Sequence, residues 1–106
     1  MRIIDNLYTT GIKEKKLKKI KNKIHSNSKL GKLKRAYVVT LPLCKDGLLE
    51  VYVYDQLLQP YYISNFDVCV IGIADTKESA MGLVTDIIQQ SYDAGYGLDI
   101  CGFLGV

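Results

Sequence analysis

The stretch that most limits how this chain can fold is VCVIGIA, residues 68–74, in which every side chain is apolar or absent. A strand with apolar residues at both alternating sets of positions leaves no face for solvent. It therefore belongs at the centre of a sheet that is covered on both sides. The 106 residues suffice for one core of this kind. We expect residues 1–106 to form a single α+β domain.

Two segments that precede this strand predict a β-hairpin. Residues 36–43, AYVVTLPL, are β-branched and apolar, and residues 48–54, LLEVYVY, alternate between two faces. A turn sequence that contains Asp46 and Gly47 separates them. The hairpin is followed by DQLLQPYY, which predicts one helical turn broken at Pro60.

Residues 75–95 predict a long helix, capped by Asp75 or Thr76 and ended by Gly95. Residues 98–105, LDICGFLG, predict a last strand. A strand, a helix and a strand in this order form a right-handed βαβ unit with parallel strands. The sequence thus predicts a four-stranded mixed sheet, made of a hairpin and a βαβ unit, with a C-terminal helix on one face.

The other face of that sheet needs a cover, and the N-terminal third of the chain offers one. Residues 12–26 predict a helix with one narrow apolar edge, made of Leu17, Ile20 and Ile24. We expect this helix, within a basic segment 12–35, to cover the sheet built by residues 36–106. A second copy of the chain is the alternative cover. The segment IIDNLY before the helix predicts a short turn or helix that docks through Ile3, Ile4 and Leu7.

Charge is divided unevenly along the chain. Residues 1–35 hold twelve Lys or Arg and two acids, whereas residues 36–106 hold two Lys or Arg and nine acids. Lysine-rich surfaces bind phosphate backbones without regard to base sequence, whereas base reading favours Arg, Asn or Gln. The sequence therefore predicts that these lysines bind the phosphate backbone of a partner, which is either nucleic acid or a nucleoprotein complex. The predicted contacts are Lys15, Lys16, Lys18, Lys19, Lys21, Lys23, Lys29, Lys32, Lys34 and Arg35.

The basic run is also compatible with roles that involve no nucleic acid. The acidic half can complement the basic half, either within the domain or between two copies, or the run is a solvated helix face. Lysines also bind anionic membranes. However, the apolar edge of three aliphatic residues is thin for insertion. We expect no membrane partner.

The tyrosines suggest a second surface, because the chain has eight of them and no tryptophan. Several crowd the predicted exposed face of residues 48–54 and the loop that follows. Tyrosine is favoured at protein interfaces and also stacks on nucleic-acid bases. Together with nearby acids they predict a protein interface made of Glu50, Tyr52, Tyr54, Asp55, Tyr61 and Tyr62.

The sequence predicts no enzyme. His25 is the only histidine and has no motif partner, so we expect no catalytic residue, no cofactor and no metal. Cys44, Cys69 and Cys101 form no C-x-x-C pair. We expect Cys69 and Cys101 to be buried, Cys44 to be the candidate for an exposed thiol, and Asp75 to cap a helix rather than bind a metal. Without a signal peptide or a membrane-spanning run, we expect a cytoplasmic location.

The turn LLQPYY, followed by an apolar strand, a capped helix and a short last strand, spans residues 48–104. In these features the chain resembles small uncharacterised proteins that recur in Firmicutes, often in mobile-element neighbourhoods. The resemblance implies a standalone domain and a role in the conflict between mobile elements and hosts. Anti-CRISPR proteins, which inhibit host nucleases, have a similar size, α+β build and strong charge patches. A second hypothesis is therefore an inhibitor whose acidic, tyrosine-bearing face binds a host nuclease.

Overall fold

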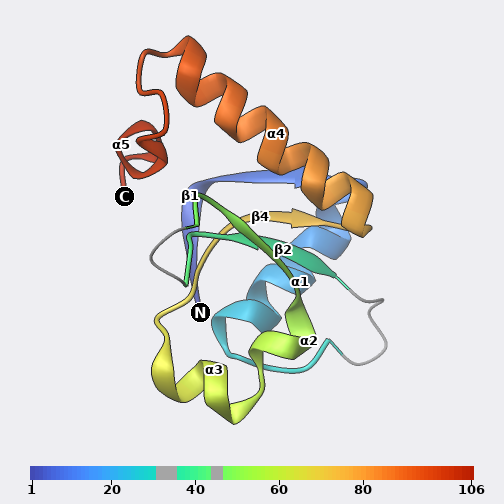
Figure 1. Ribbon diagram of the computed structural model, residues 1–106. Coiled ribbons are helices and arrows are strands. Elements are labelled where there is room, and N and C mark those ends of the chain that lie inside the picture. The colour runs from blue at the N-terminus through green and yellow to red at the C-terminus, as the bar shows by residue number, and fades with distance from the viewer. Residues whose placement is uncertain (31–35, 44–46) are drawn as a thin grey trace.

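A computed structural model describes residues 1–30, 36–43 and 47–106. Its sheet has four strands in the order β1-β4-β2-β3 (Figure 1). β1 is parallel to β4, and β2 is antiparallel to both β4 and β3. The predicted four-stranded mixed sheet and its hairpin are therefore confirmed. The strands are β1 (Arg2–Thr10), β2 (Tyr37–Thr40), β3 (Glu50–Val53) and β4 (Cys69–Ala74).

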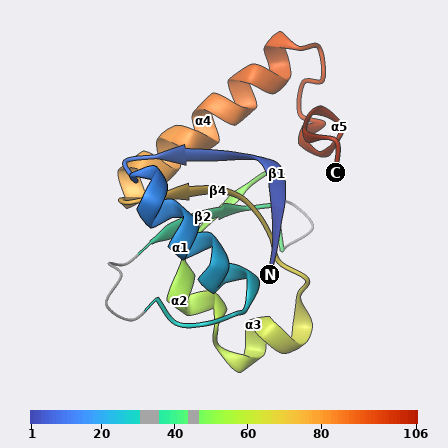
Figure 2. The ribbon, with the colours of Figure 1, turned by 180° about the vertical axis from the view of Figure 1, so that it is seen from behind.

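β4 has the central position that its sequence predicts, and all six of its residues are buried. The core forms two clusters, one on each face of the sheet. Figures 1 and 2 show α1 and α2 on one side of the sheet and α4 on the other. The helices are α1 (Glu14–His25), α2 (Tyr54–Leu57), α3 (Pro60–Asn65), α4 (Lys77–Asp93) and α5 (Ile100–Leu104).

α1 covers the face that lies opposite α4. Its Ile20 and Ile24 are buried in one cluster with Val38 and Val70 of the sheet, and Leu17 packs against the same cluster. The predicted apolar edge of the helix is therefore confirmed. A second copy of the chain is not needed to cover this face.

The prediction for the N-terminus is wrong, because residues 2–10 form the strand β1 and not a turn or helix. Ile3, Ile4 and Leu7 do pack against the core as expected. The register shifts between Ile3, which pairs with Val70, and Tyr8, which pairs with Gly72. The intervening residues form a bulge, which hides the regular alternation that marks a strand in a sequence.

The predicted strand 98–105 is also wrong, because this segment contains the helix α5. Asp99 caps the helix through its Oδ1, which accepts a hydrogen bond of 3.0 Å from the Gly102 amide. Gly105 ends it with φ +77°. The predicted βαβ unit over residues 68–104 is therefore absent from the described structure, and β4 finds its parallel partner in β1.

The long helix α4 confirms the prediction for residues 75–95 with slightly shorter bounds. The helix is capped by Thr76 and not by Asp75, because the Thr76 hydroxyl accepts a hydrogen bond of 3.0 Å from the Ser79 amide. Gly95 follows its end with φ +87°. The predicted break at Pro60 is confirmed, since Pro60 begins α3 directly after the short helix α2.

Candidate functional site

Most lysines of α1 lie on the side of the helix that faces solvent. Because Leu17, Ile20 and Ile24 occupy the buried edge, the other positions point outward. Lys16 and Lys21 flank the buried edge and are half-buried. The exposed lysines of the predicted site are Lys15, Lys18, Lys19, Lys23 and, after the helix, Lys29. Lys32, Lys34 and Arg35 lie outside the described residues.

Three of these lysines form a row along α1. Lys15, Lys19 and Lys23 recur at intervals of four residues, so their Cβ atoms lie about 6 Å apart along one side of the helix. The row spans about 12 Å at the Cβ atoms, so each of its three ammonium groups can reach a different phosphate of the same strand. The helix thus holds the bases of these lysine side chains in one line.

This positive charge has no acidic partner among the described residues. The one ion pair there joins the Arg2 Nε and the Asp67 Oδ2 at 3.2 Å, away from the lysines of α1. Glu14 is the only acid of α1 itself. Because the sheet separates α1 from α4, the acids of α4 do not neutralise the lysines within the domain.

Two shallow hollows lie between these lysines. One, of about 550 Å³, is lined by Glu14, Lys15, Leu17, Lys18 and Lys21. The other, of about 470 Å³, is lined by Lys19, Asn22, Lys23, Ser26 and Ser28.

The second hollow combines ammonium, amide and hydroxyl groups, which suits phosphate and sugar oxygens. Ser26 and Ser28 share a hydroxyl–hydroxyl hydrogen bond of 2.7 Å at its rim. Sequence reasoning missed both serines as contacts, because HSNS reads as a helix stop.

Tyr54 fixes the C-terminal end of α1 and is not an interface residue. It is fully buried in α2, so the prediction that it lies on an exposed face is wrong. Its hydroxyl donates to the Ser28 carbonyl at 2.8 Å, and the Lys23 carbonyl lies 3.2 Å away. Desolvation by burial, with the charge of Asp55 as a smaller cause, raises the pKa of Tyr54 to about 12.

The other predicted tyrosines gather in an aromatic cluster, which we define as Tyr52, Tyr61, Tyr62 and Phe66. Their ring centroids lie between 5.3 and 6.0 Å apart. Tyr52 and Tyr62 are half-buried, whereas Tyr61 is 63% exposed. Phe66 was missed by the sequence, where nothing links it to the tyrosines. Tyr61 is therefore the most exposed ring of the cluster.

The acids of residues 36–106 that the structure describes do not form a joint surface, because several of them bind groups of their own chain. A carboxylate oxygen of Glu50 accepts hydrogen bonds from the Leu43 amide and the Tyr52 hydroxyl. Asp93 accepts a hydrogen bond from Gln89, while Asp67 forms an ion pair and Asp99 caps α5. Asp55, on α2, is exposed.

The carboxyl ends of β1 and β4 lie side by side, as parallel strands require. Gly11 follows β1 with φ +75°, and Asp75 follows β4. A Cβ on Gly11 would overlap the Asp75 carboxylate, which fills this strand end. Among the described residues, no group of three His, Cys, Asp or Glu gathers that could hold a metal.

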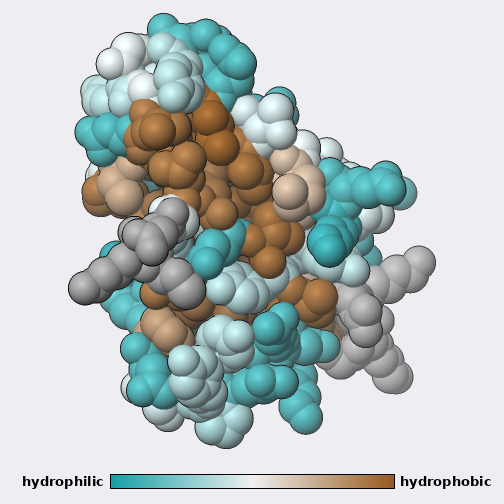
Figure 3. Space-filling view, in the orientation of Figure 1, coloured by the Kyte–Doolittle hydropathy of each residue, from teal (hydrophilic) through white to brown (hydrophobic). Residues whose placement is uncertain are grey.

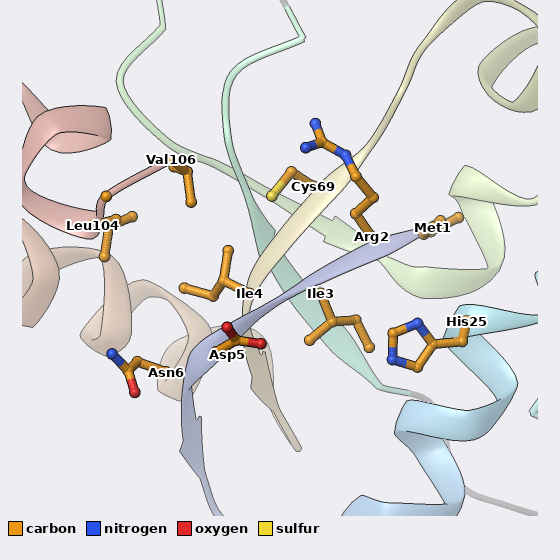
Figure 4. Close-up of a pocket in the computed structure, with 11 residues that line it drawn as sticks. Met1, Arg2, Ile3, Ile4, Asp5, Asn6, His25, Cys69, Leu104 and Val106 are labelled. Carbon is orange, nitrogen blue, oxygen red and sulfur yellow. The ribbon is translucent and has the colours of Figure 1, made fainter.

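A hollow of about 450 Å³ runs along β1 and is lined by Met1–Asn6, His25, Cys69 and residues 104–106 (Figure 4). In this view Ile3 lies between the side chains of Asp5 and His25, so the two do not face each other as a base and its orienting acid. Cys69 is buried, and burial raises the pKa of its thiol. Cys101 is exposed, contrary to the prediction, and Cys44 lies outside the described residues.

Comparison of the chain with protein-family models, with curated proteins and with solved structures gives no match. In the part of the chain that the structure describes, no helix has the length and apolar character needed to cross a membrane. The apolar edge of α1 packs in the core and is therefore not free to enter a bilayer.

Proposed function

We propose that this protein is a non-enzymatic binding module that engages the phosphate backbone of nucleic acid, or of a nucleic-acid-handling complex, through α1. The observation that supports this is the row of exposed lysines on a helix that its own apolar edge holds in the core. No acid of the described residues pairs with them. Such a surface gains its affinity from the release of counterions.

The residue types favour recognition of the partner through its phosphate backbone and not through its bases. Lysine is a point charge, whereas bidentate recognition of a base favours arginine. The hollow near the end of α1 adds Asn22, Ser26 and Ser28, whose short polar side chains commonly contact phosphate and sugar. Binding that is independent of base sequence follows from this composition.

The experiment measures affinity for duplex DNA, duplex RNA and single strands of equal length across a salt series. If three to four phosphates are neutralised, the logarithm of the binding constant falls with the logarithm of salt with a slope of about −3 on duplex DNA. Each of the variants Lys15→Gln, Lys19→Gln and Lys23→Gln is expected to reduce this slope by about 0.9.

The matched control is Lys77→Gln, which removes an exposed lysine from α4 on the other face of the sheet. This variant should leave the slope unchanged. Absence of binding at low salt contradicts the proposal. So does an equal effect of Lys77→Gln and Lys19→Gln.

A second candidate function is a mobile-element-encoded inhibitor of a host nuclease, as the resemblance implies. The exposed Tyr61 favours it, because its ring packs edge-to-face against Phe66 and Tyr62. Ile63, two residues further along the chain, is 45% exposed. Rigidly held aromatic residues of this kind dominate the energy of many protein interfaces. Capture of a purified nuclease should then be lost with Tyr61→Ala or Asp55→Lys and kept with Lys19→Gln. The opposite pattern assigns the capture to α1.

A further inference from the structure

α4 has a second apolar stripe beside its buried side. Its buried side is made of Ala80, Leu83, Ile87 and Ser91. Gln90 marks the flank toward β1, because its side chain accepts a hydrogen bond of 2.9 Å from the Tyr8 hydroxyl. The opposite flank faces β3, which is the other edge of the sheet. This outer stripe is made of Met81, Val84, Ile88 and Tyr92.

The stripe is continuous and accessible. Its members recur at intervals of three and four residues, so they form one line along the helix. Met81 is 50% exposed and Tyr92 is 53% exposed, while Val84 and Ile88 are half-buried. Val84 and Ile88 also pack against the α4-side core cluster, so Met81 and Tyr92 are the most accessible part of the stripe.

The sheet beside the stripe is also apolar and incompletely covered. α4 contacts β3 less than it contacts β1, β2 or β4. Leu41, Leu49 and Val51 are therefore only half-buried on this face, although they pack against the α4-side core cluster. Figure 3 shows a continuous hydrophobic area that extends from α4 and α5 toward the hairpin. We call the outer stripe and these three residues the α4–β3 surface.

The size of the α4–β3 surface is that of a small, weak interface between proteins. The stripe from Met81 to Tyr92 spans about 17 Å, and the helix flank together with two strands is about 20 Å wide. The product is about 340 Å² for one chain, or about 700 Å² for two, which is the size of a weak, transient interface. The largest apolar patch of a soluble monomer has about this size and is often functional.

Charge indicates what covers the surface. Lys77 is the one charged residue of α4 in line with the outer stripe, and it lies at the N-terminal end of the helix. The last turn of α4 contains Asp93 and no basic residue. The partial negative charge at the C-terminal end of the helix is therefore not balanced by a cation of α4 itself. An antiparallel copy of α4 brings the Lys77 of each chain to the C-terminal end of the other helix. The surface is thus complementary to itself.

We propose that a second copy of this chain docks on the α4–β3 surface, with the two α4 helices antiparallel about a twofold axis. The stripes of Met81, Val84, Ile88 and Tyr92 pack against each other and over the hairpin of the partner. Glu78, Asp86 and Asp93 remain on the solvent side of each helix. Because α1 lies on the other face of the sheet, its lysines do not oppose the association.

The experiment is sedimentation of the full chain from about 1 µM to about 500 µM, the range in which an interface of this modest size associates. About 0.5 M salt keeps nucleic acid off α1, while apolar contacts persist. The variant Met81→Glu places a charge in the stripe and is expected to weaken the dimer at least tenfold. Since Met81 is half exposed, the fold tolerates the change, and circular dichroism checks this.

The matched control is Gly82→Glu, which adds the same charge one residue further on. An added Cβ at Gly82 meets no atom within 4 Å, and the residue lies on the solvent side of α4. This variant should leave the dissociation constant within about twofold. Lys77→Glu, compared with the wild type in about 0.1 M salt where the charge is less screened, should weaken the dimer about threefold through the helix end of the partner.

Three results overturn the proposal. The first is a monomer over the whole concentration range, which leaves the surface to a partner of another kind. The second is an equal loss of association in Met81→Glu and Gly82→Glu, which places the interface elsewhere. The third is a dimer that Lys77→Glu leaves unchanged or strengthens, which excludes the antiparallel arrangement of the helices.

Discussion

The buried hydroxyl of Tyr54 should stabilise the end of the basic helix by an amount that can be measured. One O–H donates one good hydrogen bond, and the nearer acceptor is the Ser28 carbonyl at 2.8 Å. The Lys23 carbonyl keeps other donors, namely the Ser28 amide at 2.9 Å and the Ser26 hydroxyl at 3.2 Å. Tyr54→Phe therefore leaves one carbonyl unsatisfied and should cost about 1.5 kcal/mol of unfolding free energy at pH 7.

The raised pKa of Tyr54 gives this prediction a pH dependence. The pKa is about 12 in the folded protein and about 10 in the unfolded chain, so only the unfolded state loses the proton between these values. The stability from this hydroxyl is fully present below pH 10 and is lost as the pH rises toward 12. Between pH 9 and pH 11 the wild-type protein should lose most of this stability, about 1 kcal/mol, which Tyr54→Phe does not lose.

The assay is urea unfolding of both proteins under reducing conditions at pH 7, 9, 10 and 11. The other tyrosines and the lysines are common to both proteins, so their titration cancels in the difference. The difference in unfolding free energy should be about 1.5 kcal/mol up to pH 9 and about 1 kcal/mol smaller at pH 11. A difference that stays constant across this range would refute the burial of the hydroxyl, and no difference at pH 7 would refute its hydrogen bond.

Two further substitutions test the packing of the sheet. Thr40 Oγ1 is buried and has no hydrogen-bond partner among the described residues. Thr40→Val should therefore raise the unfolding free energy by about 1 kcal/mol. A lower unfolding free energy in urea contradicts this. Gly11→Ala should lower the unfolding free energy by about 1.5 kcal/mol because the backbone there has a positive φ, whereas the exposed Asp75 carboxylate can move away from the new methyl group. Adding Asp75→Ala to Gly11→Ala should therefore restore little of the loss, and full recovery in thermal unfolding would mean that the clash is the cause.

The elements that the sequence predicts well are those whose signal is local. The unbroken apolar run of β4, the strand pair 36–54 and the periodic pattern of α4 each identify an element within about twenty residues. The lysines and the apolar edge of α1 are equally visible, which is why the edge packs in the core and most of the described lysines are exposed, as the pattern predicts.

The errors occur where a distant partner or a local polar contact decides the structure. β1 is recognisable only through its pairing with β4, and its bulge interrupts the alternation that marks a strand. α5 depends on the cap that one side chain, Asp99, provides, although the residues after it have a strand-like composition. Tyr54 lies at the junction of β3 and α2, so an alternating pattern extended by one residue placed it on the wrong side.

The strand order β1-β4-β2-β3 constrains the order in which the chain can fold. β4 lies between β1 and β2, and both of these neighbours precede it in the chain. On the ribosome, the first half of the protein therefore emerges before the central strand of its sheet. Ile20 and Ile24 of α1 cannot complete their packing until Val70 has been synthesised. The hairpin β2–β3 is the one strand pair that can form by then. Folding is completed by the insertion of β4, a long-range step that makes this small domain slow for its size.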